Sequence, residues 1–226
     1  MSNAPILFGH RGARGHAQEN TIPSFELAIR LGATGLETDA WITRDGVVVL
    51  DHDGEFGPRL RRRSISEVDV DQLPEHVPSL AELFRVIDGH HVSIDIKDER
   101  AFEPLTRVIR ESQLDPERVW LCHPNLDLVV SWRSHTTCRL VHSTRYAKVQ
   151  PHFEVHAARL SRDGIDAFNM PYSEWTGGLI ALYHRFEVNC FAWNVNYTDA
   201  AVPLVAAGID ALYGDYVDRL VDAVKG

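Results

Sequence analysis

Residues 6–41 read ILFGHRGARGHAQENTIPSFELAIRLGATGLETDAW, and this stretch carries the pattern from which the fold can be derived. Two short apolar runs, Ile6–Gly9 and Gly35–Trp41, have the length and composition of buried strands. Between them, Ile22–Leu31 has the length of a helix and follows Thr21, a residue type that caps helix N-termini. The stretch therefore predicts a strand, a helix and a second strand.

The alternation of short apolar runs with longer amphipathic segments continues along nearly the whole chain. Further strands are predicted at Val47–Leu50, His91–Ile96, Val119–Cys122, Arg139–His142, Ile165–Met170, Val188–Trp193 and Ala211–Tyr213. Further helices are predicted at Leu80–Ile87, Ala101–Ser112, Leu126–Ser134, Phe153–Arg162, Gly177–Phe186, Asp199–Ala207 and Val217–Val224. Alternation of this kind indicates parallel strands covered by helices. With about eight such units and no linker, we predict a single (βα)8 TIM barrel over residues 1–226, with an open doubly wound sheet as the alternative.

The least regular segment, residues 53–78, is polar and contains a cluster of arginines. The cluster consists of Arg59, Arg61, Arg62 and Arg63. We predict that this segment is a short insertion loop after the second strand region. We interpret its arginines as a solvated charge run.

The composition is that of a globular protein, with 44% hydrophobic and 24% charged residues. The formal net charge of −9 argues against a nucleic-acid-binding protein, which normally has a basic surface. Cys122, Cys138 and Cys190 form no CxxC pair, so neither a disulfide framework nor a thiolate zinc site is expected. No apolar run reaches the ~18 residues of a transmembrane segment, and Met1–Pro5 lacks the features of a signal peptide. A cytoplasmic enzyme is therefore expected.

Charged side chains cluster where the predicted strands end, which is where a βα barrel places its reactive groups. Glu37 and Asp39 are two residues apart and lie on one face of a strand, and so do Asp95 and Lys97 on a later strand. Buried charges are costly unless each is paired or bound to a metal. Glu37, Asp39 and Asp95 would form a hard oxygen site for one divalent cation, Mg²⁺, Ca²⁺ or Mn²⁺. A salt bridge to Lys97 is the competing interpretation of Asp95.

Two histidines follow predicted strands: His10 comes directly after the first, and His52 comes shortly after Val47–Leu50. Two such imidazoles can act as base and acid in a hydrolysis. Arg11 and Lys97 supply cationic donors for a phosphate, which an arginine can bind in bidentate fashion. A metal, two imidazoles and two cations describe a site that cleaves a phosphodiester. The expected partner is therefore a small-molecule phosphodiester.

Residues 9–53 also contain a series of short motifs in a fixed order. They are His10–Gly12 (HRG), Glu19–Thr21 (ENT), Ser24–Phe25 (SF), Glu37 and Asp39 (E-x-D), Thr43 with Asp45–Gly46 (T-x-D-G), and His52–Asp53 (HD). In this order they resemble the signature region of the glycerophosphodiester phosphodiesterase family. Weaker matches recur at residues 93–97, 191–196 and 208–215, whereas residues 99–183 match poorly.

The resemblance implies a (βα)8 barrel that hydrolyses glycerophosphodiesters to an alcohol and glycerol 3-phosphate. It also implies roles for individual residues: His10 and His52 as the acid/base pair, Glu37 and Asp39 as metal ligands, Arg11 and Lys97 at the phosphate, Trp193 lining the glycerol pocket, and Glu19 as a polar support beside the first histidine. In the mechanism usually proposed for the family, the substrate's own glycerol hydroxyl attacks phosphorus and gives a cyclic phosphate.

The chain departs from the family pattern in two places. Asp95 stands where the family typically has a glutamate in an E-x-K strand, and it is one methylene shorter. The insertion over residues 53–78 looks shorter than usual and carries the arginine cluster. The second departure leaves the alcohol or head group open. The sequence as a whole also leaves open the native ion and the oligomeric state.

Several other interpretations of the sequence remain open. A lysophospholipase D-type phosphodiesterase would use the same site on an acylated substrate. A non-catalytic phosphate or head-group binding barrel is the alternative from another class. A sugar-phosphate isomerase or aldolase barrel would need a catalytic lysine or glutamate base and a late glycine-rich phosphate loop. It ranks last, because the chain has only three lysines and the signature motifs would be unexplained. Asp215 is interpreted as a helix N-cap, and His123 and His142 as neighbours or pocket-lining residues.

Overall fold

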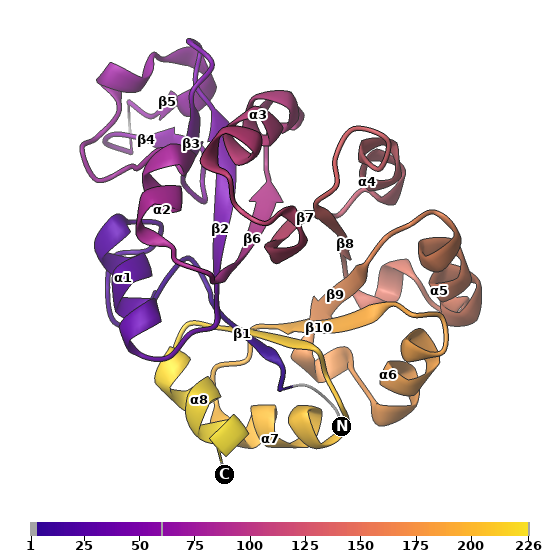
Figure 1. Ribbon diagram of the computed structural model, residues 1–226. Coiled ribbons are helices and arrows are strands. Elements are labelled where there is room, and N and C mark those ends of the chain that lie inside the picture. Colours follow the sequence, from indigo (N-terminus) through magenta and orange to yellow (C-terminus); the bar gives the residue numbers. More distant parts are fainter. Residues whose placement is uncertain (1–3, 60, 226) are drawn as a thin grey trace.

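The computed structural model describes residues 4–59 and 61–225 and shows a closed barrel of eight parallel strands surrounded by helices (Figure 1). The barrel strands are β1 (Ile6–Gly9), β2 (Gly35–Ile42), β6 (His91–Ile96), β7 (Val119–His123), β8 (Arg139–Ser143), β9 (Ala167–Pro171), β10 (Asn189–Trp193) and β11 (Ala211–Gly214). Strand β1 pairs in parallel with β11 on one side and with β2 on the other. This double pairing closes the sheet, so the TIM-barrel prediction is confirmed and the open doubly wound sheet is wrong.

The helices form a ring around the strands, as Figure 1 shows. They are α1 (Ile22–Arg30), α2 (Leu80–Val86), α3 (Phe102–Ser112), α4 (Leu126–Trp132), α5 (Phe153–Arg162), α6 (Gly177–His184), α7 (Thr198–Ala206) and α8 (Val217–Lys225). Thr21 caps α1 by accepting a hydrogen bond from Ser24 N, as the sequence predicts. In the described part of the chain, no helix has the length and apolar character needed to cross a membrane. The expectation about a signal peptide falls partly on residues 1–3, which lie outside the described residues.

Strand β3 (Val48–Leu50) is not a barrel strand, because it pairs with β2 in the antiparallel direction. The hydrogen bonding between β3 and β2 extends one residue beyond β3, because Asp51 N donates to Asp39 O at 3.1 Å. Residues 53–78 then contain the small hairpin β4 (Glu55–Phe56) and β5 (Arg63–Ser64), which Figure 1 shows beside β3 and apart from the ring of helices. The 3₁₀ helices within residues 4–59 and 61–225 are Ile65–Glu67, Val70–Gln72, Glu99–Ala101, Pro116–Arg118, Tyr146–Lys148 and Tyr172–Glu174.

Two hydrophobic cores stabilise the barrel. The larger one lies between the strands and the helices, and the smaller one fills the interior of the barrel. In the interior, Phe8 stacks on Tyr213 with ring centroids 4.6 Å apart, and Trp120 meets Phe191 at 4.8 Å. Side chains two residues further along each strand face the same way, so the polar residues that follow this apolar layer lie above it. The interior core therefore lies directly beneath the polar side chains at the C-terminal ends of the strands.

His142 lies in the layer between barrel and helices, within a chain of hydrogen bonds whose direction is fixed. Its Nε2 donates to Pro124 O at 3.2 Å, because a carbonyl can only accept. Its Nδ1, 2.9 Å from His156 Nε2, must then accept from that nitrogen, and His156 Nδ1 accepts from Tyr183 Oη at 2.7 Å. Burial lowers the pKa of His142 to about 4 and that of His156 to about 3. Both imidazoles are therefore neutral in the folded protein near pH 7.

The low pKa values of His142 and His156 predict that the folded protein loses stability in mild acid. Their folded-state pKa values lie below the ~6.5 of an unfolded histidine, so the unfolded chain binds more protons as the pH falls below ~6.5. Each histidine should lower the free energy of unfolding by about 1.4 kcal/mol per pH unit between ~6 and ~5. We expect His156→Gln to remove about that much from the slope, measured by urea unfolding at several pH values. The exposed His135→Gln is the control, and an unchanged slope in His156→Gln would contradict this account.

Candidate active site

The turn that follows β1 places His10 and Arg11 at the mouth of the barrel. Arg11 has a φ of 51° and Gly12 a φ of 82°, both in the left-handed region. At Gly12 a Cβ would lie 2.5 Å from Ser24 Oγ, so only glycine fits there. The left-handed Arg11 is strained for a residue with a side chain. Its backbone N–H is directed at β2 and donates to Glu37 Oε2 at 2.9 Å.

His10 is held between two carboxylates. On one side its Nδ1 lies 2.6 Å from Asp215 Oδ1, and on the other its Nε2 lies 3.8 Å from Glu37 Oε2. Asp215 is in turn fixed by Asn196, whose Nδ2 donates to Asp215 Oδ2 at 3.2 Å and whose Oδ1 accepts from Asp215 N at 2.8 Å. The carboxylate of Asp215 favours the tautomer of His10 that carries its proton on Nδ1. The lone pair of a neutral His10 is therefore on Nε2, the nitrogen nearer Glu37.

Burial and charge act on His10 and Glu37 in opposite directions. Burial lowers the pKa of His10, but the charge of Glu37 and the hydrogen bond to Asp215 raise it by more. Burial, followed by the neighbouring charge of Asp39, raises the pKa of Glu37 to about 7. The raised pKa of Glu37 indicates that the negative charges of Glu37 and Asp39 lie close together and are not fully balanced by neighbouring positive charges. Such pairs are typical of functional sites.

Two cations face the carboxylates of β2 and β6. Arg11 Nε lies 3.2 Å from Asp39 Oδ2, and Lys97 Nζ lies 3.0 Å from Asp39 Oδ1 and 2.5 Å from Asp95 Oδ2. Asp39 and Asp95 are register partners on adjacent strands, which explains how one lysine reaches both. Burial lowers the pKa of Lys97, but the two carboxylates raise it by more, so the lysine stays charged.

The predicted metal ligands fit a hard divalent cation to different degrees. Glu37 and Asp39 are both buried, lie on one face of β2 and offer only oxygen donors, which suits Mg²⁺, Ca²⁺ or Mn²⁺. Asp95 forms a direct salt bridge with Lys97, which is the competing interpretation of this residue from the sequence. Among residues 4–59 and 61–225, these three carboxylates do not form a set whose oxygens all lie within 4.8 Å of one another. Asp39 is paired with Lys97 as well, and also with Arg11. Among the described residues, Glu37 is therefore the one of the three carboxylates without a lysine or arginine ion-pair partner.

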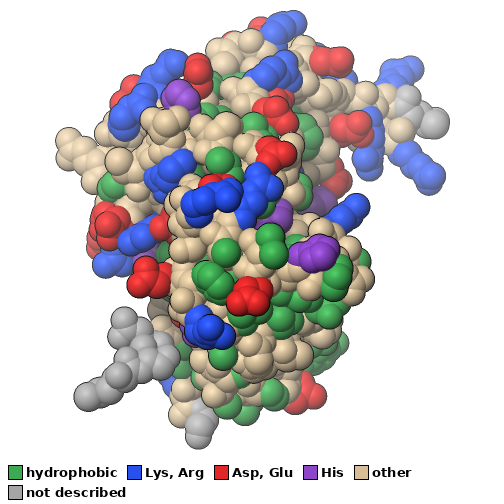
Figure 2. All heavy atoms as spheres, turned by 90° about the vertical axis from the view of Figure 1, so that its right-hand side faces the viewer, with side chains coloured by type: hydrophobic (Ala, Val, Ile, Leu, Met, Phe, Trp, Pro, Cys, Tyr) green, Lys and Arg blue, Asp and Glu red, His purple; other side chains and the backbone are tan. Residues whose placement is uncertain are grey.

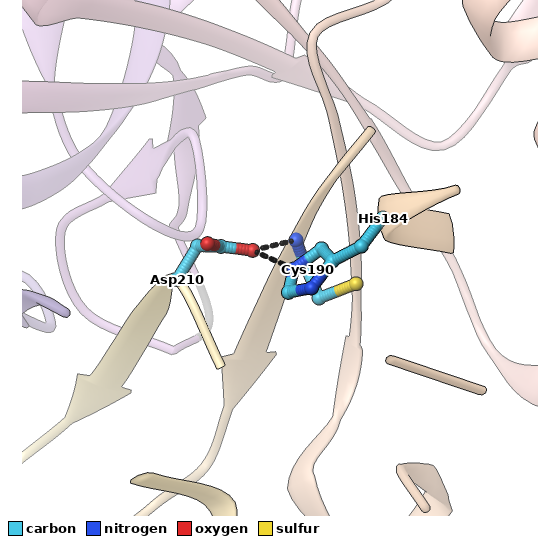
Figure 3. A group of neighbouring side chains, drawn as sticks. All are labelled: His184, Cys190 and Asp210. Carbon is cyan, nitrogen blue, oxygen red and sulfur yellow. Dashed lines mark hydrogen bonds and ion pairs between the residues drawn. The ribbon is translucent and has the colours of Figure 1, made fainter. Parts of the chain in front are cut away.

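A different trio does meet that distance criterion, and Figure 3 shows it. It consists of His184, Cys190 and Asp210, which lie at the opposite end of the barrel, around the first residues of β10 and β11. Asp210 Oδ2 is already occupied, because it lies 2.7 Å from His184 Nε2 and accepts from Cys190 N at 2.7 Å. The thiol of Cys190 is fully buried and faces the carbonyls of Ile180 and Val188. This trio is a hydrogen-bonded connection between strand ends and not part of the candidate active site.

A cavity of about 430 Å³ collects most of the predicted site residues at the C-terminal ends of the strands. Its lining includes His10, Arg11, Glu37, Asp39, Asp95, Lys97 and Trp193. Trp193 comes from the end of β10, and the Arg145 guanidinium lies 5.2 Å from the centre of its ring. The volume is in the range of small-ligand sites.

Two predicted residues lie outside this lining. His52 follows β3, is about one-third exposed, and its Nδ1 lies 2.8 Å from Asp53 Oδ1. Its neighbour Asp51 is held to Asp39 O, so this segment lies at the rim of the site. Glu19 accepts two hydrogen bonds from Arg11 Nη1, at 3.0 and 3.1 Å, and pairs with Arg14. Glu19 therefore contacts the arginine next to His10 and not the histidine itself.

The structure also identifies site residues that the sequence interpretation missed. The N-cap interpretation of Asp215 is wrong as an account of its side chain, which binds His10 and Asn196. Its position directly after β11, at the catalytic end of the barrel, was the available signal. Asn20, inside the ENT motif, accepts from Thr38 Oγ1 at 2.7 Å and donates to Asp39 Oδ2 at 3.2 Å. Asn20 thus fixes a carboxylate that the sequence did identify.

Comparisons with known proteins agree with this geometry. Residues 10–219 match the family described as the glycerophosphoryl diester phosphodiesterase family. A glycerophosphodiester phosphodiesterase of Caldanaerobacter subterraneus is 26% identical over 97% of this chain and 98% of its own. The crystal structure of a glycerophosphodiester phosphodiesterase from Thermotoga maritima superposes with a TM-score of 0.85 at 22% identity, covering 98% of this chain and 99% of that one. An Oleispira antarctica phosphodiesterase in complex with the product sn-glycerol-3-phosphate gives 0.87 at 19% identity, covering 99% and 98%.

Proposed function

Because the chain belongs to the glycerophosphoryl diester phosphodiesterase family, we propose that it hydrolyses glycerophosphodiesters to an alcohol and glycerol 3-phosphate. In this proposal His10 and His52 transfer the protons, and one divalent cation is held by Glu37 and Asp39. The observation that carries it is the placement of His10, with Asp215 behind its Nδ1 and Glu37 before its Nε2. The product named in the Oleispira antarctica complex supports the choice of substrate class.

The proton transfers follow from the tautomer of His10. With Nδ1–H donated to Asp215, Nε2 is free to take a proton from an attacking hydroxyl or to return one to a leaving oxygen. Asp215 stabilises the imidazolium that results, in the way a buried aspartate supports a catalytic histidine. One imidazole cannot be base and acid on opposite sides of a phosphorus at once. We assign the second role to His52, which directly follows Asp51, whose backbone N–H donates to Asp39 O at the rim of the site.

The phosphate would be bound by Arg11 and Lys97, which both line the cavity and are both held by Asp39. A fixed cation lowers the energy of charge that develops on phosphoryl oxygens without having to reorganise during the reaction. A divalent cation on Glu37 and Asp39 would supply Lewis-acid polarisation of a phosphoryl oxygen. Asp95 would act through Lys97, by keeping the ammonium at the cavity wall.

The proposal is tested by turnover of a glycerophosphodiester panel after chelation, with Mg²⁺, Ca²⁺ or Mn²⁺ restored one at a time. We expect release of glycerol 3-phosphate that requires the ion and is strongly reduced in His52→Ala. Full activity in the chelated protein would refute the cation requirement. Wild-type activity in His52→Ala would remove that residue from the mechanism. No turnover of any diester with any ion would refute the proposed function.

The high pKa of Glu37 predicts that protons compete with the cation. Below about 7 its carboxyl binds a proton, and a protonated carboxyl is a poor ligand, so affinity for the ion should fall as the pH falls. We expect isothermal titration calorimetry with Mn²⁺ to show a dissociation constant about tenfold larger at one pH unit below that pKa than at one unit above it, with protons released on binding. In Glu37→Gln this pH dependence should disappear together with most of the affinity. A pH-independent affinity in the wild type would contradict the assignment of Glu37 as a ligand.

The alternatives have less support. A lysophospholipase D-type substrate would need an apolar surface for its acyl chain. In the described residues the exposed large hydrophobic side chains are Val70, Val155, Tyr197 and Val202, of which only Tyr197 and Val202 belong to the same element, α7 with its N-cap. On the face seen in Figure 2, most charged side chains lie in the upper half, and hydrophobic side chains gather in the lower half with a few acidic and basic ones among them. A non-catalytic binding barrel would not need the fixed His10–Asp215 pair. A cytoplasmic location is part of the proposal, supported by three buried, unpaired cysteines.

A further inference from the structure

The wall of the cavity formed by β8 and β9 carries two polar side chains that the proposed reaction does not use. Ser143 and Asn169 are register partners on these neighbouring strands and both line the cavity. They stand two residues beyond Val141 and Ala167, which belong to the apolar interior of the barrel. The change from apolar to polar at the same face therefore occurs where the strands reach the cavity.

The side-chain amide of Asn169 is buried, and only its nitrogen has a hydrogen-bond partner among the described residues. The residue is 6% exposed, and its Nδ2 donates to Ser143 Oγ at 3.2 Å. Its Oδ1 is buried and has no hydrogen-bond partner in the described part of the protein. Exchanging the amide oxygen and nitrogen would only move the unpaired atom from acceptor to donor. In either orientation, a buried polar atom of a cavity-lining side chain is left for a ligand, and leaving it unmet would cost stability.

Trp193, at the end of the neighbouring strand β10, indicates which kind of ligand group would bind beside Ser143 and Asn169. Trp193 lines the same cavity, and the guanidinium of Arg145 lies over its ring. An aromatic face is the usual contact for a quaternary ammonium group, but here a cation already covers the ring. Arg145 is exposed and forms no ion pair with the other described residues, so its positive charge at this wall would repel a cationic group. A neutral group with hydroxyls suits the wall better than a cationic one.

We propose that Asn169, oriented by Ser143, is the residue that recognises a hydroxyl of the glycerol moiety of the substrate. This inference rests on the proposed function, because it concerns the same cavity. It adds a specificity-determining residue on the wall formed by β8 and β9, separate from the residues assigned to phosphate, cation and proton transfer. Asn169 selects a phosphate ester whose alcohol is a polyol over one whose alcohol is a plain alkyl chain.

Binding of product-like monoesters tests the inference without requiring turnover. The probes are sn-glycerol 3-phosphate and propyl phosphate, which share the phosphate and the carbon chain and differ in two hydroxyls. In the wild type we expect glycerol 3-phosphate to bind about tenfold more tightly or better by calorimetry, because a site built for a hydroxyl rejects the analogue that lacks it. In Asn169→Ala this ratio should fall close to one, while the affinity for propyl phosphate stays within about twofold.

Controls separate recognition from folding. Asn189→Ala removes an asparagine at the first residue of β10, where its Nδ2 donates to Asp166 O, away from the cavity, and should leave the ratio unchanged. Ser143→Ala should lower the ratio partly, because it frees the amide to rotate. An unchanged ratio in Asn169→Ala, or equal losses for both probes, would overturn the inference while leaving the hydrolysis intact. A ratio that collapses as expected in a protein without turnover would support the inference and refute the proposed function.

Discussion

Replacing His10 by alanine is expected to lower kcat for glycerophosphodiester hydrolysis by about 10³-fold or more. The imidazole is the group in the cavity whose free nitrogen faces Glu37 and whose other nitrogen is fixed by a carboxylate. Among the described residues that line the cavity, His10 is the only histidine, so the substitution removes the proposed proton carrier at that point. The loss should appear in kcat more than in KM, because Arg11 and Lys97 still bind the phosphate. Steady-state kinetics with a saturating divalent cation measure it.

The chain contains a matched control for this experiment. His16 and Asp218 form a second histidine–aspartate pair, with Nε2 and Oδ1 3.1 Å apart, between the same loop and the same C-terminal region. Both of its side chains are more than one-third exposed, and neither lines the cavity. His16→Ala should therefore keep kcat within about twofold, as is typical of an exposed position. Equal kcat values in His10→Ala and His16→Ala would show that His10 is not catalytic.

Replacing Asp215 by asparagine is expected to lower kcat on the order of 10²–10⁴-fold, although Asp215 is a positioning residue. The amide can donate a proton to His10 Nδ1, which would stabilise the tautomer with its lone pair on the wrong nitrogen. The substitution also removes a negative charge that helps raise the pKa of His10. That pKa should fall, so the limb of the pH–rate profile that reports the free imidazole should move to lower pH. A purely structural role for Asp215 would reduce stability without moving that limb.

Asp218→Asn is the corresponding control and should change neither kcat nor the pH profile. Thermal unfolding of both variants shows whether the fold is kept. Asn196→Ala should give a weaker version of the Asp215→Asn effect, because it removes the hydrogen bonds that orient the carboxylate but keeps its charge. If the limb of the pH–rate profile that reports His10 moved to higher pH in Asp215→Asn, the predicted fall in the pKa of His10 would be wrong.

Much of the fold could be predicted because its signals are local. The runs at Ile6–Gly9 and Gly35–Trp41 and the cap at Thr21 report burial and backbone geometry over a few residues. Alternation of strands and helices then leaves few architectures. Boundaries were less accurate. The strand predicted from Ile165 begins at Ala167, since Ile165 N donates to Leu160 O and closes the end of α5 instead of joining the sheet.

The barrel and one side of the site follow from local features of the sequence. Glu37 and Asp39, and likewise Asp95 and Lys97, share a face because side chains alternate along a strand, which is a local rule. The remaining contacts of the site depend on how the strands are paired in three dimensions. Asp215 lies 205 residues from His10 along the chain and reaches it because β11 pairs with β1 to close the barrel. Likewise, the pairing of β8 with β9 sets Asn169 beside Ser143, and the pairing of β2 with β6 brings Asp39 within reach of Lys97. Periodicity fixes which way a side chain faces, but the partner it meets across a closed sheet depends on which strands become neighbours.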